Sequence, residues 1–122
     1  MGGVIYDALC LNCHQADGHG LAGIYPPLAG SEWVRGPARP LIRIVTHGLA
    51  GRIEVAGATY GVQVPLPMPP MGLSDRQAAD VLTFIRGAFG NQAGAVAPDE
   101  VAAERAASAA HAGPWSATDL AK

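Results

Sequence analysis

The stretch Cys10-Leu11-Asn12-Cys13-His14 decides how this chain folds. Two cysteines three residues apart, followed at once by a histidine, form the attachment signature for c-type haem. Residues i and i+3 of a helix project from the same face, so both thiols can reach the two vinyl groups of one porphyrin. The imidazole of His14 can then ligate the iron. We therefore expect one covalent haem c, bound through Cys10 and Cys13 and ligated by His14.

Zinc is the main alternative at this motif, because Cys-x-x-Cys is also half of many zinc sites. A zinc site would need two more ligands, and the sequence contains no further cysteine. A third interpretation is two buried thiols beside an unrelated histidine. The rest of the chain supplies what a haem domain needs, so we favour haem. With both cysteines used as thioethers, none remains for a disulfide.

Length and charge narrow the class of protein. A chain of 122 residues predicts one small domain, with room for an appendage. The net charge of -2 and the lack of a basic run argue against a nucleic-acid partner. No apolar stretch approaches the length of a membrane span. The chain does not open with a signal peptide, so haem attachment in an exported compartment implies a leader that has been removed.

Three segments read as helices, which predicts an all-α fold. Residues Gly2 to Cys13 carry an apolar stripe at helical spacing. Pro37 to Gly48 has a proline near its start and a glycine at its end, as helices often do. Ser74 and Gln77 form a capping box, and the apolar period behind them continues to Gly90. The glycine-punctuated run between the second and third helices predicts a short hairpin or an irregular loop.

The glycine- and proline-rich loop Gln15 to Gly30 follows the cysteine motif. An iron-ligating histidine normally donates its second ring nitrogen to a carbonyl. Pro26 is the candidate to present that carbonyl because its fixed φ stiffens the loop, and Pro27 is the alternative. His47 could be a second axial ligand, but its place in the last turn of a helix favours a capping role.

A second proline-rich segment, Pro65-Leu66-Pro67-Met68-Pro69-Pro70-Met71-Gly72, offers a sixth ligand. Prolines on both sides restrict Met68 to an extended path, which pre-organises its side chain. A thioether is a natural ligand for haem iron, although a methionine can also simply fill the core. Met71 competes for the role, but it is better placed to pack at the next helix start. Side chains able to donate to haem propionates are Trp33, Arg43 and Tyr60.

The order of these parts resembles a class I cytochrome c. The phrases that carry the resemblance to bacterial cytochrome c subunits and domains are His14-Gln15-Ala16-Asp17-Gly18, Tyr25-Pro26-Pro27-Leu28-Ala29-Gly30-Ser31, Leu41-Ile42-Arg43-Ile44-Val45 and Val81-Leu82-Thr83-Phe84-Ile85-Arg86. The similarity covers about residues 3 to 91. It implies a small class I cytochrome c fold, with helices packed around one covalent haem. It also implies that His14 and Met68 are the axial ligands, the Met68-Pro69 pair favouring Met68.

This resemblance implies an electron carrier rather than an enzyme. Such a protein shuttles single electrons between a periplasmic dehydrogenase or reductase and another carrier or terminal oxidase. A different class, a haem-based sensor of small ligands or a peroxidase-like domain with an open sixth position, is the alternative. That class would need a distal histidine for acid–base chemistry, and the proline-rich loop offers none. The sequence assigns no oligomeric state.

Residues 1–91 are expected to form the cytochrome c domain and residues 92–122 a C-terminal tail. Pro98-Asp99-Glu100 places a proline and two acids at a helix start, and Ala112-Gly113-Pro114 ends the Ala-rich run that follows. An isolated helix of this kind is marginal in water, so it must dock or fray. Trp115 and Leu120 are the candidate anchors. A mobile linker is the alternative.

Overall fold

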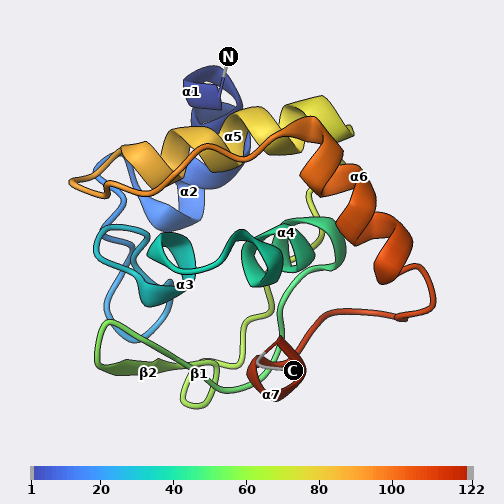
Figure 1. Cartoon of the computed structure of the whole chain (residues 1–122). Helices are drawn as coiled ribbons and strands as arrows, with labels where there is room; N and C mark the ends of the chain where they lie inside the picture. The colour runs from blue at the N-terminus through green and yellow to red at the C-terminus, as the bar shows by residue number, and fades with distance from the viewer. Residues whose placement is uncertain (1, 121–122) are drawn as a thin grey trace.

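A computed structural model of the chain describes residues 2–120. Helices dominate it, and within these residues the strands form one antiparallel hairpin at an edge of the molecule (Figure 1). In chain order the elements are α1 Gly2–Ile5, the π-helical turn η1 Tyr6–Cys10, α2 Leu11–His14, α3 Glu32–Arg35, α4 Ala38–His47, β1 Ile53–Val55, β2 Ala58–Tyr60, α5 Asp75–Gly87, α6 Pro98–Ala107 and α7 Ala117–Leu120.

The first three helical elements run on from one another, as the apolar stripe predicted. The turn η1 widens this helix just before the cysteine motif. The helix crosses α5 at Gly2, where a Cβ would lie 2.1 Å from the carbonyl oxygen of Asp80. Only glycine allows two backbones to come this close. The cysteine motif therefore starts from a fixed point on α5.

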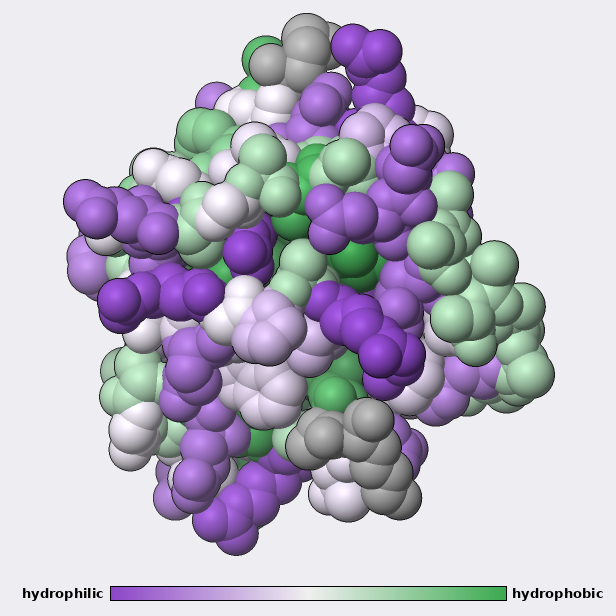
Figure 2. All heavy atoms as spheres, viewed as in Figure 1, coloured by the Kyte–Doolittle hydropathy of each residue, from purple (hydrophilic) through white to green (hydrophobic). Residues whose placement is uncertain are grey.

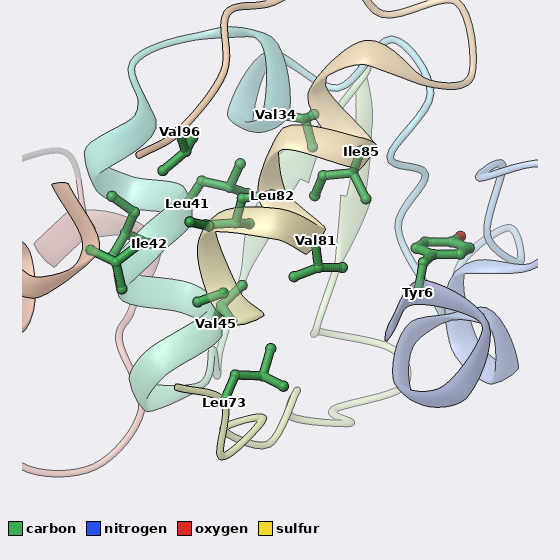
Figure 3. Close-up of a cluster of buried hydrophobic side chains, with 13 residues drawn as sticks. Tyr6, Val34, Leu41, Ile42, Val45, Leu73, Val81, Leu82, Ile85 and Val96 are labelled. Carbon is green, nitrogen blue, oxygen red and sulfur yellow. The ribbon is translucent and has the colours of Figure 1, made fainter. Parts of the chain in front are cut away.

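Helix α5 is the centre of the core. Its predicted capping box is present: the Gln77 amide donates to Ser74 Oγ at 3.1 Å, and the Ser74 amide donates to Gln77 Oε1 at 2.9 Å. Figure 3 shows side chains of α5 meeting those of α4, with Tyr6 at the other side of the cluster. The helix was predicted to continue to Gly90, and this is wrong. It ends at Gly87, and Phe89 has a φ of +57°, which turns the chain back.

Helix α4 lies within its predicted limits, Pro37 to Gly48, and Gly48, whose φ is +88°, caps its C-terminal end. The run that follows forms the hairpin of β1 and β2. Its two turn residues, Ala56 and Gly57, both have positive φ, +51° and +84°. That is the geometry of a type I′ turn, which matches the right-handed twist of paired strands. The hairpin adds a small buried cluster made of Ile53, Val55 and Tyr60.

The C-terminal segment docks on the chain itself. Helix α6 packs against α5 and α4, and Val96 and Val101 belong to the main core. In Figure 1 the red end of the chain returns below α4 to α7. The anchors Trp115 and Leu120 are 8% and 3% exposed. In Figure 2 the right side of the visible face, where Figure 1 shows α6, is pale green, as an Ala-rich helix predicts. No helix within residues 2–120 is both long and apolar enough to cross a bilayer.

Candidate haem-binding site

The residues predicted to bind haem line one cavity of about 310 Å³. Its walls include Cys10, Cys13, His14, Pro26 and Met68. A smaller apolar cavity of about 70 Å³ shares most of these residues and extends toward the core. Most other lining residues are apolar: Leu9, Ile24, Leu49, Ala50, Ile53, Leu66, Pro67, Pro69 and Met71. Apolar walls with two thiols, an imidazole and thioethers form a donor set that fits a covalent haem.

Both thiols are half-buried and unpaired with each other. Burial, and then the neighbouring Cys13, raise the pKa of Cys10 to about 11, so its sulfur is a neutral thiol at pH 7. A zinc site would need thiolates and two further ligands. Within residues 2–120, no three His, Cys, Asp or Glu side chains gather closely enough to hold a metal ion. Within the described residues the two thiols thus lack the further ligands that a zinc site needs, whereas attachment of one haem needs only these two.

His14 is 9% exposed and is held in one orientation. Its Nδ1 lies 2.8 Å from the carbonyl oxygen of Pro26. Because a carbonyl can only accept, Nδ1 carries the proton and Nε2 keeps its lone pair free for a metal. Burial lowers the pKa of His14, and the Pro26 bond opposes this only in part. The side chain is thus a neutral imidazole at pH 7.

The loop that presents the Pro26 carbonyl is tied down on both sides. The Gly20 amide donates to the carbonyl oxygen of His14 at 2.9 Å. Asn91, just beyond α5, accepts from the Gly30 amide through Oδ1 and donates from Nδ2 to the carbonyl oxygen of Leu28, each at 3.0 Å. The supporting role of Asn91 could not be read from the sequence, since these bonds span more than sixty residues.

Both methionines line the cavity, and they are held differently. Met68 exchanges two backbone hydrogen bonds with Leu49, of 2.8 and 2.9 Å, and packs against the buried residues Ile44, Trp115 and Leu120. Met71 donates its amide to the carbonyl oxygen of Val45 at 3.1 Å and packs against the main core. The two methionines therefore pack against different buried clusters.

Of the other candidates from the sequence, Trp33 lines the smaller cavity, and two of them make polar contacts with other parts of the chain. Trp33 Nε1 donates to the carbonyl oxygen of Glu54 at 2.9 Å, and Arg43 Nε pairs with Glu104 at 2.5 Å. Tyr60 does line the cavity. His47 is not among the lining residues and instead meets the ring of Trp115 edge-on, at a centroid distance of 6.0 Å. Sequence reasoning missed the wall residues Leu49 and Ile53, because nothing but their tertiary position marks them.

Comparison with known proteins agrees with this geometry. The family model for cytochrome c matches residues 1–89. The chain is 40% identical over 95 residues to cytochrome c-552 of Thermus thermophilus, covering 74% of this chain and 69% of that protein. It is 37% identical over 102 residues to the gluconate 2-dehydrogenase cytochrome c subunit of Pantoea cypripedii, and 32% over 111 residues to the fructose dehydrogenase cytochrome subunit of Gluconobacter japonicus.

Those two alignments cover 75% and 86% of this chain but only 21% and 22% of the dehydrogenase subunits. The chain thus spans about a fifth of their length. The alignments, the family match and the cavity lead to one conclusion: this chain belongs to the cytochrome c family, with the class I fold, a covalent haem c and a role in electron transfer.

Proposed function

We propose that this chain carries single electrons between a periplasmic dehydrogenase and another carrier or oxidase, with His14 and Met68 as the axial ligands of its iron. His14 and both methionines line one apolar cavity with Cys10 and Cys13, and Met68 is the methionine with a proline on each side, which supports it as the ligand. When bound, the haem iron supplies reversible one-electron chemistry. The residues around it orient the ligands, exclude water and set the potential.

The chain's own groups act on that potential in two ways. A methionine ligand raises the reduction potential, because soft sulfur favours ferrous iron. The apolar walls lower the local dielectric, which disfavours the more highly charged oxidised site. The hydrogen bond from His14 to Pro26 keeps the imidazole in one tautomer through both oxidation states. Little rearrangement is then needed as an electron arrives or leaves.

A partner is proposed to dock where the cavity opens. Leu9 and Leu66 line the cavity and are still 43% and 50% exposed, so they form an apolar rim at its mouth. The chain has one lysine, Lys122, and none in the cytochrome region. We expect a small, transient contact held by apolar burial rather than by charge steering. Two relatives are cytochrome subunits of dehydrogenases, so a dehydrogenase is the proposed source of electrons. The periplasm is the proposed compartment.

A redox titration with a carbon monoxide test checks the proposed function. The purified holoprotein should titrate as a single one-electron couple. Its ferrous form should bind carbon monoxide poorly at neutral pH, because Met68 fills the sixth position. Rapid carbon monoxide binding, or turnover of peroxide, would instead favour the sensor or peroxidase class.

The docking proposal is checked separately. The rate of electron transfer with a quinone-dependent dehydrogenase should change less than about tenfold between low and physiological salt.

A further inference from the structure

Leu49 lies between the methionine segment and the C-terminal segment. On one side its amide donates to the carbonyl oxygen of Met68, and its own carbonyl accepts from the Met68 amide. On the other side the neighbours of Leu49 bond to Trp115: the Trp115 amide donates to Gly48 at 3.0 Å, and the Ala50 amide donates to Trp115 at 2.9 Å. The first pairing is antiparallel and the second parallel. Met68, Leu49 and Trp115 thus form a short ladder of three backbones.

The side chain of Trp115 makes ring contacts of its own, although its buried Nε1 has no hydrogen-bond partner among the described residues. The ring of His111 stacks on it at 3.5 Å with an interplanar angle of 3°, and the guanidinium carbon of Arg43 lies 4.6 Å from its centroid. Met68 and Leu49 pack against the same cluster that contains Trp115. Such stacking and cation–π contacts resist displacement of the ring. Trp115, the outermost residue of the ladder, is therefore held by contacts of its side chain as well as by its backbone hydrogen bonds.

Helix α6 holds the other end of the methionine segment. An Arg105 guanidinium nitrogen donates to the carbonyl oxygen of Leu73, two residues after Met71. Arg105 Nε also lies 3.0 Å from a carboxylate oxygen of Asp75, as an ion pair outside hydrogen-bond geometry. The helix itself is anchored by Val101, which is fully buried. The C-terminal segment (residues 92–120) thus packs on Met68 through the cluster of Trp115 and bonds to the chain after Met71 through Arg105.

The methionine segment has few other supports. Between residues 61 and 70, backbone hydrogen bonds outside strands connect Leu66 to Val64 and Met68 to Leu49. Segments with few buried contacts and few hydrogen bonds open locally at low free energy. Opening here would move Met68 away from the cavity. The backbone pairing of Met68 with Leu49, and the Trp115 backbone on the other side of Leu49, therefore limit how often the methionine segment opens.

We propose that the C-terminal segment keeps Met68 at the cavity, and that Trp115 is the positioning residue through which it does so. The proposal rests on the proposed ligation by Met68. The family model ends at residue 89, so this support lies outside the part of the chain that the model matches. Loosening Trp115 should raise the population of the state in which Met68 has left the iron, without changing any residue of the cavity.

Imidazole added to the ferric holoprotein tests this, because it ligates iron only when Met68 has left. The apparent dissociation constant then varies inversely with the open population. Trp115→Ala should bind imidazole about tenfold more tightly, and Trp115→Phe, which keeps an aromatic ring, should recover much of the difference. Arg105→Gln should also tighten imidazole binding, because it removes the hydrogen bond to Leu73 at the C-terminal end of the methionine segment. Val96→Ala is the control: it trims a buried residue of the same segment, 4% exposed, that belongs to the main core and makes no backbone hydrogen bond to Leu49 or Met68.

Amide hydrogen exchange of Met68 gives a second readout that does not depend on which methionine ligates iron. It should accelerate in Trp115→Ala and stay near wild type in Val96→Ala. Unchanged Met68 exchange and imidazole affinity in Trp115→Ala would overturn the proposal, as would equal changes in Val96→Ala. If Met68→Ala keeps its methionine-to-iron band, the ligand assignment fails, and the exchange comparison still decides whether Trp115 holds this segment. Should Trp115→Ala fail to fold, Trp115→Leu, which removes the stacking on His111 and the Arg43 contact but keeps apolar volume, replaces it in the same comparison.

Discussion

The imidazole of His14 is oriented by the carbonyl of Pro26, at 2.8 Å across twelve residues of chain. The position of this carbonyl depends on Gly20. A Cβ there would lie 2.7 Å from the Pro26 oxygen and 2.2 Å from that of Tyr25, and the φ of Gly20 is +66°. No side chain fits without moving the carbonyl. The orientation of His14 is therefore set partly by a residue that carries no side chain.

Gly20→Ala should accordingly destabilise the holoprotein by about 2 kcal/mol or more, from left-handed strain plus the clash. Gly23→Ala is the matched control. Its φ is +77°, and nothing lies within 4 Å of its Cβ position. It should show the strain alone, about 1 kcal/mol. Denaturant unfolding of both variants makes the comparison, and equal losses would mean that the Pro26 carbonyl is not sterically confined.

A second glycine pair tests the methionine segment. A Cβ on Gly48 would lie 2.6 Å from the carbonyl oxygen of Met68, whereas one on Gly51 would meet nothing within 4 Å. Their φ values are similar, +88° and +84°. Gly48→Ala should therefore weaken the methionine-to-iron band of the ferric protein, and Gly51→Ala should keep it. A full band in Gly48→Ala would show that Met68 tolerates displacement.

The ion pairs of Glu104 should differ in strength. Arg43 and Glu104 are 12% and 7% exposed at their side chains, whereas Arg39 is 63% exposed. Removing Arg43 leaves a buried carboxylate poorly compensated and also removes the contact with Trp115. Arg43→Ala should cost about 2–3 kcal/mol of unfolding free energy, and Arg39→Ala less than about 1 kcal/mol. A double-mutant cycle with Glu104→Gln measures each pair, and similar coupling energies for the two arginines would contradict this ranking.

The unfolding free energy is expected to depend on pH through the protonation of His47. Burial, then His111 and Arg105, lower its pKa, so the folded protein binds this proton less tightly than the unfolded chain does. The unfolding free energy should therefore be highest above the ordinary histidine pKa of about 6.5 and decrease as the pH falls below it. In His47→Gln the decrease between about pH 7.5 and pH 5.5 should be smaller. Parallel pH profiles for the variant and the wild type would rule out this contribution.

The site could be predicted from the sequence where its signals are local. The cysteine motif, the capping box at Ser74 and the proline-flanked Met68 each lie within a few residues, and each reflects a rule about neighbouring side chains. The hydrogen bond to Pro26 could be anticipated too, because a metal-ligating histidine needs an acceptor and the loop offers two prolines. The structure selects Pro26 over Pro27 as that acceptor.

Contacts between distant segments could not be predicted in this way. The ladder of Met68, Leu49 and Trp115 is made of backbone bonds, which leave no pattern of residue types. The helix end at Gly87 was missed because Phe89 keeps the apolar period while its positive φ turns the chain. Its ring then packs near Tyr6, at a centroid distance of 5.2 Å. Periodicity records which side chains are apolar, not where the backbone turns.

The most direct test of the whole account is the reduction potential and ferric spectrum of Met68→Ala beside those of Met71→Ala. Both methionines line the cavity, so the two variants remove similar apolar volume from the same site. Met68→Ala should lose the methionine-to-iron band and lower the potential by on the order of 0.1 V, since sulfur ligation favours ferrous iron. Met71→Ala should keep the band and shift the potential far less. Loss of the band in Met71→Ala, with the band retained in Met68→Ala, would contradict it.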